Sequence, residues 1–245
     1  YKETRNISLS EYPHLSLGEC CKILNGSTPF KKENSYWEIG TIPWFTIEDI
    51  RNQGRIIKYT SKKITEKALK ETSVKLLPKN TVLLCCTASV GEYAFTEIEV
   101  TTNQQFNGLI VNNKYKDKLL PKFLFHLSSA FKDELIRISG KTSFNFVSVS
   151  VLKTLQIPLP PLSIQEEIVA EIEGYQKIID GAKMVVENYR PQIKIDPDWE
   201  MVELGELAEN LDGKRVPITK SDRKEGQYPY YGASGIVDYV DDYIF

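Results

Sequence analysis

The chain has 245 residues, of which 41% are hydrophobic and 11% aromatic, so it is long enough to bury one complete domain and part of another. No apolar run approaches the roughly 20 residues that span a bilayer, and the opening residues Tyr1 to Arg5 lack the apolar core of a signal peptide. From these features we expect a cytoplasmic protein rather than a membrane or secreted one. The net charge of −2 by itself argues against a nucleic-acid partner.

The distribution of charge changes that expectation. Residues 14–160 carry 20 basic and 13 acidic side chains, a net charge of +7, whereas residues 161–198 carry −4 and residues 199–245 carry −5. A basic first domain is therefore followed by an acidic remainder. The excess favours a polyanionic partner for the first domain, although an ordinary solvated surface accounts for a charge of this size equally well.

The four cysteines are two adjacent pairs, Cys20-Cys21 and Cys85-Cys86. Neighbouring residues of a strand point to opposite faces, so we expect reduced core residues and no local disulfide. Only His14 and His126 could add further soft ligands, and the spacing of a zinc site is missing. The sequence predicts no metal.

In chain order, a polar lead-in over residues 1–13 precedes a first domain over 14–160. Residues 15–26 read as a short strand or turn, a brief apolar element and a loop that ends at Gly26. Short apolar runs then predict strands within 41–50 and 75–88, and at 92–95, 97–101 and 106–111, and a 3.6-residue apolar period predicts one helix over 121–138. The expected fold class is α+β, with a mostly-β domain that contains short helices rather than a wound α/β sheet.

A long helix is predicted over residues 161–191. Pro160 and Pro161 stop the preceding strand, Ser163 and Glu166 have the spacing of a capping box, and Pro191 ends the pattern. About 27 residues give roughly 40 Å of helix, longer than a small domain is wide. We therefore expect a spacer and dimerisation helix of the coiled-coil type, although the same stripe could pack on its own domain. The expected interface residues are Ile168, Ile172, Tyr175, Ile179, Ala182, Val186 and Tyr189.

The chain then restarts over residues 192–245. Residues 15–26, LSLGECCKILNG, align without gaps on residues 202–213, VELGELAENLDG, with an offset of 187. The shared residues are Leu17/Leu204, Gly18/Gly205, Glu19/Glu206 and Gly26/Gly213. A globular domain followed by a long helix is thus one repeat, and the tail is the start of a second.

Several motifs together resemble the target-recognition domains of Type I restriction–modification specificity subunits. They are Leu17-Gly18-Glu19, the loop 26–29 (GSTP), residues 42–49 (IPWFTIED), 76–83 (LLPKNTVL), 88–91 (ASVG), 102–109 (TNQQFNGL), and 157–162 (IPLPPL) leading into Gln165. Their order and spacing agree along residues 15–190. The tail resembles another subtype of this domain through residues 228–236 (YPYYGASGI) and 239–245 (YVDDYIF).

The resemblance implies that two recognition domains each read half of a bipartite DNA site, while the two long helices pair and dock methyltransferase subunits. The basic domain would then meet DNA, and the acidic helix would meet protein. The second domain stops about 47 residues after it begins. Whether the chain is a truncation, a fragment or half of a dimer, and whether a methyltransferase region precedes it, stays open.

The sequence lacks the catalytic signatures of DNA-modifying enzymes. An adenine methyltransferase would need an Asn/Asp-Pro-Pro-aromatic motif, and Leu159-Pro160-Pro161-Leu162 lacks the amide or carboxylate. The sequence contains neither Glu-x-Lys, expected of a metal-dependent nuclease, nor GxxxxGK[ST]. The sequence therefore predicts a non-catalytic polypeptide without its own cofactor, and the resemblance assigns S-adenosylmethionine and magnesium to partner subunits only.

DNA recognition needs polar side chains for base edges and cations for phosphates, and the predicted loops supply both. Trp37 and Trp44 are expected in the core rather than as stacking platforms. Lys58, Lys62, Lys63, Lys67 and Lys70 form either a phosphate track or a solvated helix face. The candidate DNA contacts are Ser27, Thr28, Lys31, Lys32, Asn34, Thr46, Glu48, Asp49, Arg51, Thr87, Ser89, Asn103, Gln104, Gln105, Lys141, Thr142, Ser143 and Asn145.

The leading hypothesis is sequence-specific recognition of double-stranded DNA that positions an adenine-methyltransferase subunit, with a restriction or translocase subunit as a further candidate partner and self-association through the long helix as another. The alternatives are a methyltransferase or nuclease fragment with its own catalysis, and a protein–protein assembly factor without DNA binding. The base sequence recognised and the oligomeric state cannot be read from one chain.

Overall fold

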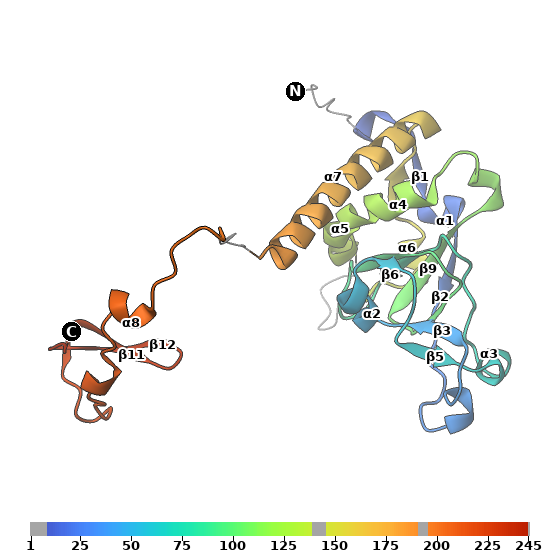
Figure 1. The fold of residues 1–245 in the computed structure, drawn as a ribbon. Coiled ribbons are helices and arrows are strands. Elements are labelled where there is room, and N and C mark those ends of the chain that lie inside the picture. Colours follow the sequence, from blue (N-terminus) through green and yellow to red (C-terminus); the bar gives the residue numbers. More distant parts are fainter. Residues whose placement is uncertain (1–8, 139–145, 191–195, 245) are drawn as a thin grey trace. The chain divides into compact units, whose positions relative to one another are not determined.

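The computed structural model describes residues 9–138, 146–190 and 196–244 (Figure 1). The chain divides into two compact units, Tyr1–Asn188 and Tyr189–Phe245. No helix in these ranges is long and apolar enough to cross a membrane.

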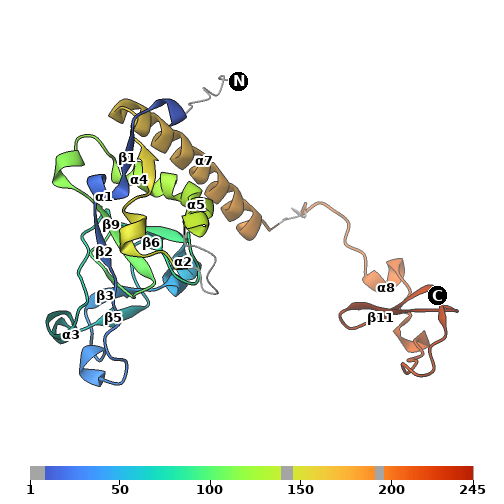
Figure 2. The ribbon, with the colours of Figure 1, turned by 180° about the vertical axis from the view of Figure 1, so that it is seen from behind.

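The first unit is built on short strands in three sheets (Figures 1 and 2). The largest sheet has the strand order β2-β9-β6-β7-β4, a second has the order β5-β3-β8, and β1 pairs with β10. The strands are β1 (His14–Ser16), β2 (Cys21–Asn25), β3 (Ile42–Phe45), β4 (Ile56–Ile57), β5 (Lys62–Ile64), β6 (Val82–Cys85), β7 (Tyr93–Thr96), β8 (Thr101–Thr102), β9 (Phe106–Val111) and β10 (Gln156–Pro158). The helices are α1 (Leu17–Cys20), α2 (Ile47–Gln53), α3 (Glu66–Glu71), α4 (Pro121–Leu127), α5 (Phe131–Ile138), α6 (Val149–Leu152) and α7 (Leu162–Asn188), with 3-10 turns at Leu9–Glu11, Asn34–Tyr36, Asn113–Tyr115 and Ser128–Ala130.

Strand β6 divides two apolar cores. Val82 and Leu84 pack into the larger core with side chains of α4 and α5, whereas Leu83 and Cys85 pack into a second core. All four residues are buried, because both faces of the sheet are covered at β6. This explains why the segment reads as a continuous apolar run instead of an alternating one. The expected α+β class with a mostly-β first domain is confirmed.

Three predicted elements differ from the structure. Of residues 97–101, expected to form one strand, only Thr101 lies in a strand, β8, and Val100 forms an isolated bridge with Leu77. Ile47, expected in a strand, begins helix α2, because Thr46 and Asp49 form a capping box that starts a helix directly after β3. The helix predicted over 121–138 is divided into α4 and α5 by the 3-10 turn at Ser128–Ala130. The Ser128 hydroxyl donates to the Leu124 carbonyl at 2.8 Å, a side-chain bond of the kind that bends helices.

The long helix α7 is present over 27 residues. It begins at Leu162, so Ser163 lies inside the first turn and is not the N-cap that the sequence suggested. The amides of Ile164 and Gln165 bond instead to the Pro161 carbonyl at 3.0 and 3.1 Å. Pro161 is therefore the residue that precedes the first helical residue of α7.

Gln165 attaches the start of α7 to its own domain. The side chain is fully buried, accepts from the Leu120 amide at 2.9 Å, and donates to the carbonyls of Lys118 and Pro160 at 2.7 and 2.8 Å. Ile168 packs against the larger core, and Val169 is only 9% exposed. From Ile172 onward the apolar side chains of α7 are exposed within the first unit.

The second unit contains α8 (Leu204–Leu207), a 3-10 turn at Asp212–Lys214, and the hairpin β11 (Glu225–Gly232) and β12 (Gly235–Val240). Helices α1 and α8 both have four residues, and their first residues are 187 positions apart, the offset found in the sequence. The same local structure thus opens each repeat.

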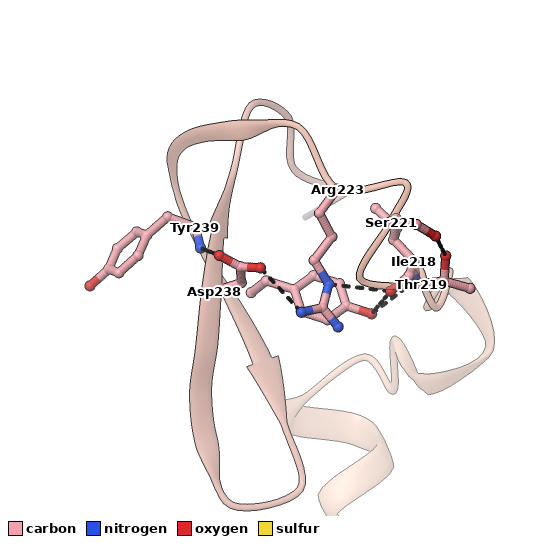
Figure 3. A network of polar contacts seen from close by, with 7 residues as sticks. Ile218, Thr219, Ser221, Arg223, Asp238 and Tyr239 are labelled. Carbon is pink, nitrogen blue, oxygen red and sulfur yellow. Dashed lines mark hydrogen bonds and ion pairs between the residues drawn. The ribbon is translucent and has the colours of Figure 1, made fainter.

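A polar network stabilises this hairpin (Figure 3). The Arg223 guanidinium lies 4.5 Å from the centroid of the Tyr230 ring, 3.2 Å from Asp238 Oδ2, and 3.3 Å from the Ile218 carbonyl to which it donates. The Tyr239 amide and then Arg223 hold the pKa of Asp238 below its ordinary value. The side chain of Arg223 is only 17% exposed, so the network is a structural brace of the second unit.

Candidate nucleic-acid interface

Several strand ends of the first unit meet at one edge. The last residue of β2, Asn25, pairs with Asn107, and the last residue of β6, Cys85, pairs with Phe106 at the start of β9. The last residue of β3, Phe45, pairs with Thr102. The loops that leave these strands are therefore neighbours, and we call the polar residues they carry the rim: Ser27, Thr28, Thr46, Thr87, Ser89, Asn103, Gln104 and Gln105.

Backbone hydrogen bonds fix the rim. The Ser27 amide donates to the Thr102 carbonyl at 2.8 Å, and the Cys86 amide donates to the Gln105 carbonyl at 2.9 Å. Gly26 is required by a close approach, because a Cβ at this position would lie 2.1 Å from the Asn103 carbonyl oxygen. The rim backbone is thus held without using most of the rim side chains.

The side chains from the loops after β2 and β8 contact one another. The Thr28 hydroxyl donates to Gln104 Oε1, and the Ser27 hydroxyl lies 2.8 Å from that of Ser73. Gln104 is exposed, and its contact with Thr28 uses only the amide oxygen. The sequence-predicted contacts Ser27, Thr28 and Gln104 therefore form one continuous polar surface.

Two candidate contacts are turned inward. Asn103 is 9% exposed, and its side chain bonds to the Gln105 amide and to Gln105 Oε1, both at 3.0 Å. Asp49 is 1% exposed and accepts from the Thr46 amide at 2.8 Å and from the Ser61 amide at 2.7 Å. We assign both residues to holding their loops, because neither presents a free polar group at the surface.

Helix α2 begins at the rim and carries the candidates Glu48 and Arg51. Their side chains form an exposed ion pair at 2.6 Å. Exposed pairs of this type contribute at most about 1 kcal/mol, so either group can exchange its partner for a ligand at low cost.

A hollow of about 420 Å³ lies beside α2. Its apolar lining includes Ile47, Ile50 and Val90, and Arg51, Ser89 and Lys132 supply polar groups. The turn that carries Ser89 contains Ala88 at φ 61°, a left-handed conformation that favours glycine or asparagine. The structure thus brings Arg51 and Ser89 together, although they are far apart in sequence.

The remaining candidates are Lys31, Lys32 and Asn34, and a group within residues 141–145. Lys31, Lys32 and Asn34 are exposed in the loop between β2 and β3. Lys141, Thr142, Ser143 and Asn145 fall outside the described residues. The chain is described again from Phe146, which forms a bridge with Thr87, and the next amide, Val147, donates to the Cys86 carbonyl at 2.9 Å.

The sequence did not single out Lys132 or Asn25. Lys132 lies in α5, read as an ordinary amphipathic helix, and only the fold places it beside Arg51. Asn25 is exposed at the end of β2, and its Nδ2 donates to Asn107 Oδ1 at 3.1 Å. An asparagine just before the Gly26 turn was the only signal, and it equally indicates a turn.

The cysteines do not take part in the rim. All four thiols are buried and free, and burial raises the pKa of Cys86 to about 12. Trp44, 4% exposed, is a core residue as expected, and its indole donates to the Ser27 carbonyl at 3.2 Å. Among the described residues no group of three or more His, Cys, Asp or Glu side chains is placed to hold a metal ion.

The fold is that of a modular protein: a scaffold of short strands with polar loops at one edge is followed by a long helix and by a second unit with a helix equivalent to α1. The family model described as "Type I restriction modification DNA specificity domain" matches residues 10–187 and 197–245. The chain therefore belongs to this family, as the sequence motifs predicted. The two matched segments begin 187 residues apart, which is the offset of the internal repeat.

Curated relatives are specificity subunits. The chain is 29% identical over 257 residues to the Type I restriction enzyme EcoprrI specificity subunit of Escherichia coli, covering 95% of this chain and 64% of the relative. It is 34% identical over 165 residues to the MjaIX specificity subunit of Methanocaldococcus jannaschii, covering 66% of this chain and 37% of the relative. The chain thus spans less than two thirds of the length of these relatives.

Solved structures share the fold. The HsdS subunit from Thermoanaerobacter tengcongensis matches with a TM-score of 0.54 and 20% identity, over 76% of this chain and 42% of that one. The Type I restriction–modification S subunit from M. genitalium matches with a TM-score of 0.51 and 15% identity, over 99% of this chain and 64% of that one.

Proposed function

We propose that this chain is a non-catalytic DNA-specificity polypeptide that reads the bases of double-stranded DNA with the rim of its first unit. The observation that carries the proposal is the convergence of polar loops from four strand ends on one edge, within a family named for DNA specificity. The net charge of +7 over residues 14–160 supports a polyanionic partner.

The rim residues have distinct roles in this proposal. The amide of Gln104 suits the donor and acceptor pattern of adenine, and Arg51 suits guanine once it leaves Glu48. Lys31, Lys32 and Lys132 hold phosphates. Asn103 and Asp49 act only through the loops that they hold in place.

The exposed stripe on α7 is the proposed protein interface. Ile172, Tyr175 and Ile179 are 40%, 55% and 48% exposed, and Val186 and Tyr189 are 79% and 71% exposed. Side chains of this size in a regular helical row are typical of a surface that pairs with another helix. Ile168 is not part of this proposed interface, because its side chain packs against the larger core of the first unit.

The partners follow from the family. An adenine-methyltransferase subunit docks on α7, a restriction or translocase subunit joins the complex, and S-adenosylmethionine and magnesium bind in those subunits. Residues 14–160 form the recognition domain, 161–191 the spacer helix, and 192–245 the start of a second recognition domain. The site read is then bipartite, and the protein works in the cytoplasm, where DNA is accessible.

The test is selection of bound sequences from a randomised duplex library with the full chain, followed by titration of the selected duplex at several salt concentrations. Gln104→Ala should lose about tenfold in preference over unselected DNA, as expected for one bidentate base contact. Gln156→Ala, an exposed glutamine on β10, is the matched control and should bind as the original chain does.

The lysines give an independent readout. The double variant Lys31→Ala/Lys32→Ala should reduce the slope of log K against log salt by up to about 1.8, since each phosphate contact contributes about 0.9. The double variant of Lys116 and Lys118, beyond the opposite end of β9, should leave it unchanged. Absence of any salt-dependent duplex binding would refute the proposal, and methylation or cleavage of DNA by the chain alone would establish the catalytic alternative.

A further inference from the structure

The loop between β2 and β3, residues 29–40, exposes two large apolar side chains. Ile39 is 97% exposed and Phe30 is 67% exposed, and the exposed Lys31 and Lys32 follow Phe30 in sequence. We call this segment the tip loop. In Figures 1 and 2 it extends past β3 and β5, at the end of the unit farthest from β1.

Hydrogen bonds and ring packing fix the tip loop to the rest of the first unit. The Trp37 indole donates to the Phe30 carbonyl at 3.2 Å, and its ring packs edge-on against Trp44 with centroids 5.0 Å apart. The Thr65 hydroxyl and amide donate to the carbonyls of Ser35 and Tyr36 at 2.8 and 2.9 Å. The loop is therefore a fixed projection, and its exposed apolar groups are presented in a defined position.

Ile39 gains nothing from the fold in this position. Its φ of 55° is in the left-handed region, which a β-branched residue rarely adopts and which asparagine or glycine occupies readily. Its side chain is also almost completely exposed, so burial does not offset the strain. Strain together with exposure at one residue points to a contact that is made only with a partner.

We propose that Ile39 reads thymine by packing against its 5-methyl group in the major groove. The inference rests on the proposed function, because the partner is the duplex that the rim reads. The tip loop starts directly after Thr28, and Trp44, on which it packs, bonds to Ser27 of the rim. The thymine methyl is the apolar group on the major-groove edges of the bases, and the exposed Lys31 and Lys32 of the same loop suit phosphates.

The experiment is a double-mutant cycle that combines one change in the protein with one change in the DNA. Each thymine of the selected duplex is replaced in turn by uracil, which removes only the methyl group, and binding is measured for the full chain and for Ile39→Asn. At one position the original chain should lose about fourfold in affinity, as the removal of one buried methyl group implies. The Ile39→Asn variant should bind the thymine duplex more weakly and show no further loss with uracil at that position.

Controls separate the outcomes. Ile39→Asn and Ile39→Gly both suit a positive φ, so neither should lower the urea midpoint of the first unit, and Ile178→Asn, at an exposed apolar position of α7, should leave DNA affinity unchanged. Equal uracil effects in the original chain and in Ile39→Asn would overturn the thymine contact while leaving rim recognition intact. Failure of the original chain to select any sequence would overturn both proposals.

Discussion

Replacement of Gln165 tests how α7 is attached to the first unit. The Gln165→Ala change removes three hydrogen bonds and leaves the Leu120 amide and the carbonyls of Lys118 and Pro160 without that partner. A hydrogen bond contributes about 1 kcal/mol net, and a buried group left unsatisfied costs about 1–3 kcal/mol. We expect the free energy of unfolding of the first unit to fall by about 2–4 kcal/mol.

The assay is urea unfolding followed by tryptophan fluorescence in a Trp199→Phe background. The remaining tryptophans, Trp37 and Trp44, both lie in the first unit, so the signal reports that unit alone. Gln165→Met retains most of the volume and should remain destabilised, which separates hydrogen bonding from packing. Gln176→Ala on the same helix is the matched control, because this exposed side chain makes one contact, with Asp180 at 2.8 Å.

The control should change stability by less than about 0.5 kcal/mol, as surface substitutions usually do. If Gln165→Ala were no more destabilising than Gln176→Ala, the attachment of α7 through Gln165 would be refuted. A loss restored by Gln165→Met would instead identify packing as the cause.

Two further predictions concern a close approach and a titrating group. Gly26→Ala should destabilise the first unit by about 3 kcal/mol, because the added Cβ clashes with the Asn103 carbonyl. Gly174→Ala on α7, where a Cβ meets no atom, should stabilise the unit by up to about 1 kcal/mol. Equal urea midpoints of the two variants would contradict this prediction. Burial lowers the pKa of His126 despite the opposing effect of Glu173, so the protonated ring favours the unfolded chain and stability should fall as the pH falls below about 6.5. His126→Phe should flatten this part of a urea-midpoint profile against pH, and an unchanged slope would show that other groups cause it.

Local pattern predicted the elements whose cause is local. Strand β9 has the bounds expected from its apolar run, and α7 has the expected length because its period and flanking prolines lie in the segment itself. Helix α2 was missed because Ile42 to Ile47 read as one strand, although Thr46 and Asp49 already had capping-box spacing. The break between α4 and α5 depends on one serine side chain, which no apolar period reveals.

The candidate site shows the same division. The sequence identified the loops of the rim, since polar residues cluster after each predicted strand. It could not show that the Asp49 carboxylate accepts a hydrogen bond from Ser61, twelve residues away, or that the Asn103 side chain bonds to Gln105. Nor could it show the exposure of Ile39, because isoleucine is ordinarily expected to be buried.

Backbone hydrogen bonds hold the rim, so the fold tolerates substitution of its exposed side chains. Because main-chain bonds such as Gly26 to Phe106 and Cys86 to Gln105 hold the loops, exposed side chains such as Gln104 contribute little to folding. Substitutions there can alter which bases are preferred while the scaffold stays intact. New DNA preferences are thus accessible by single steps that each leave a folded protein, and a library randomised at exposed rim positions should consist largely of folded members.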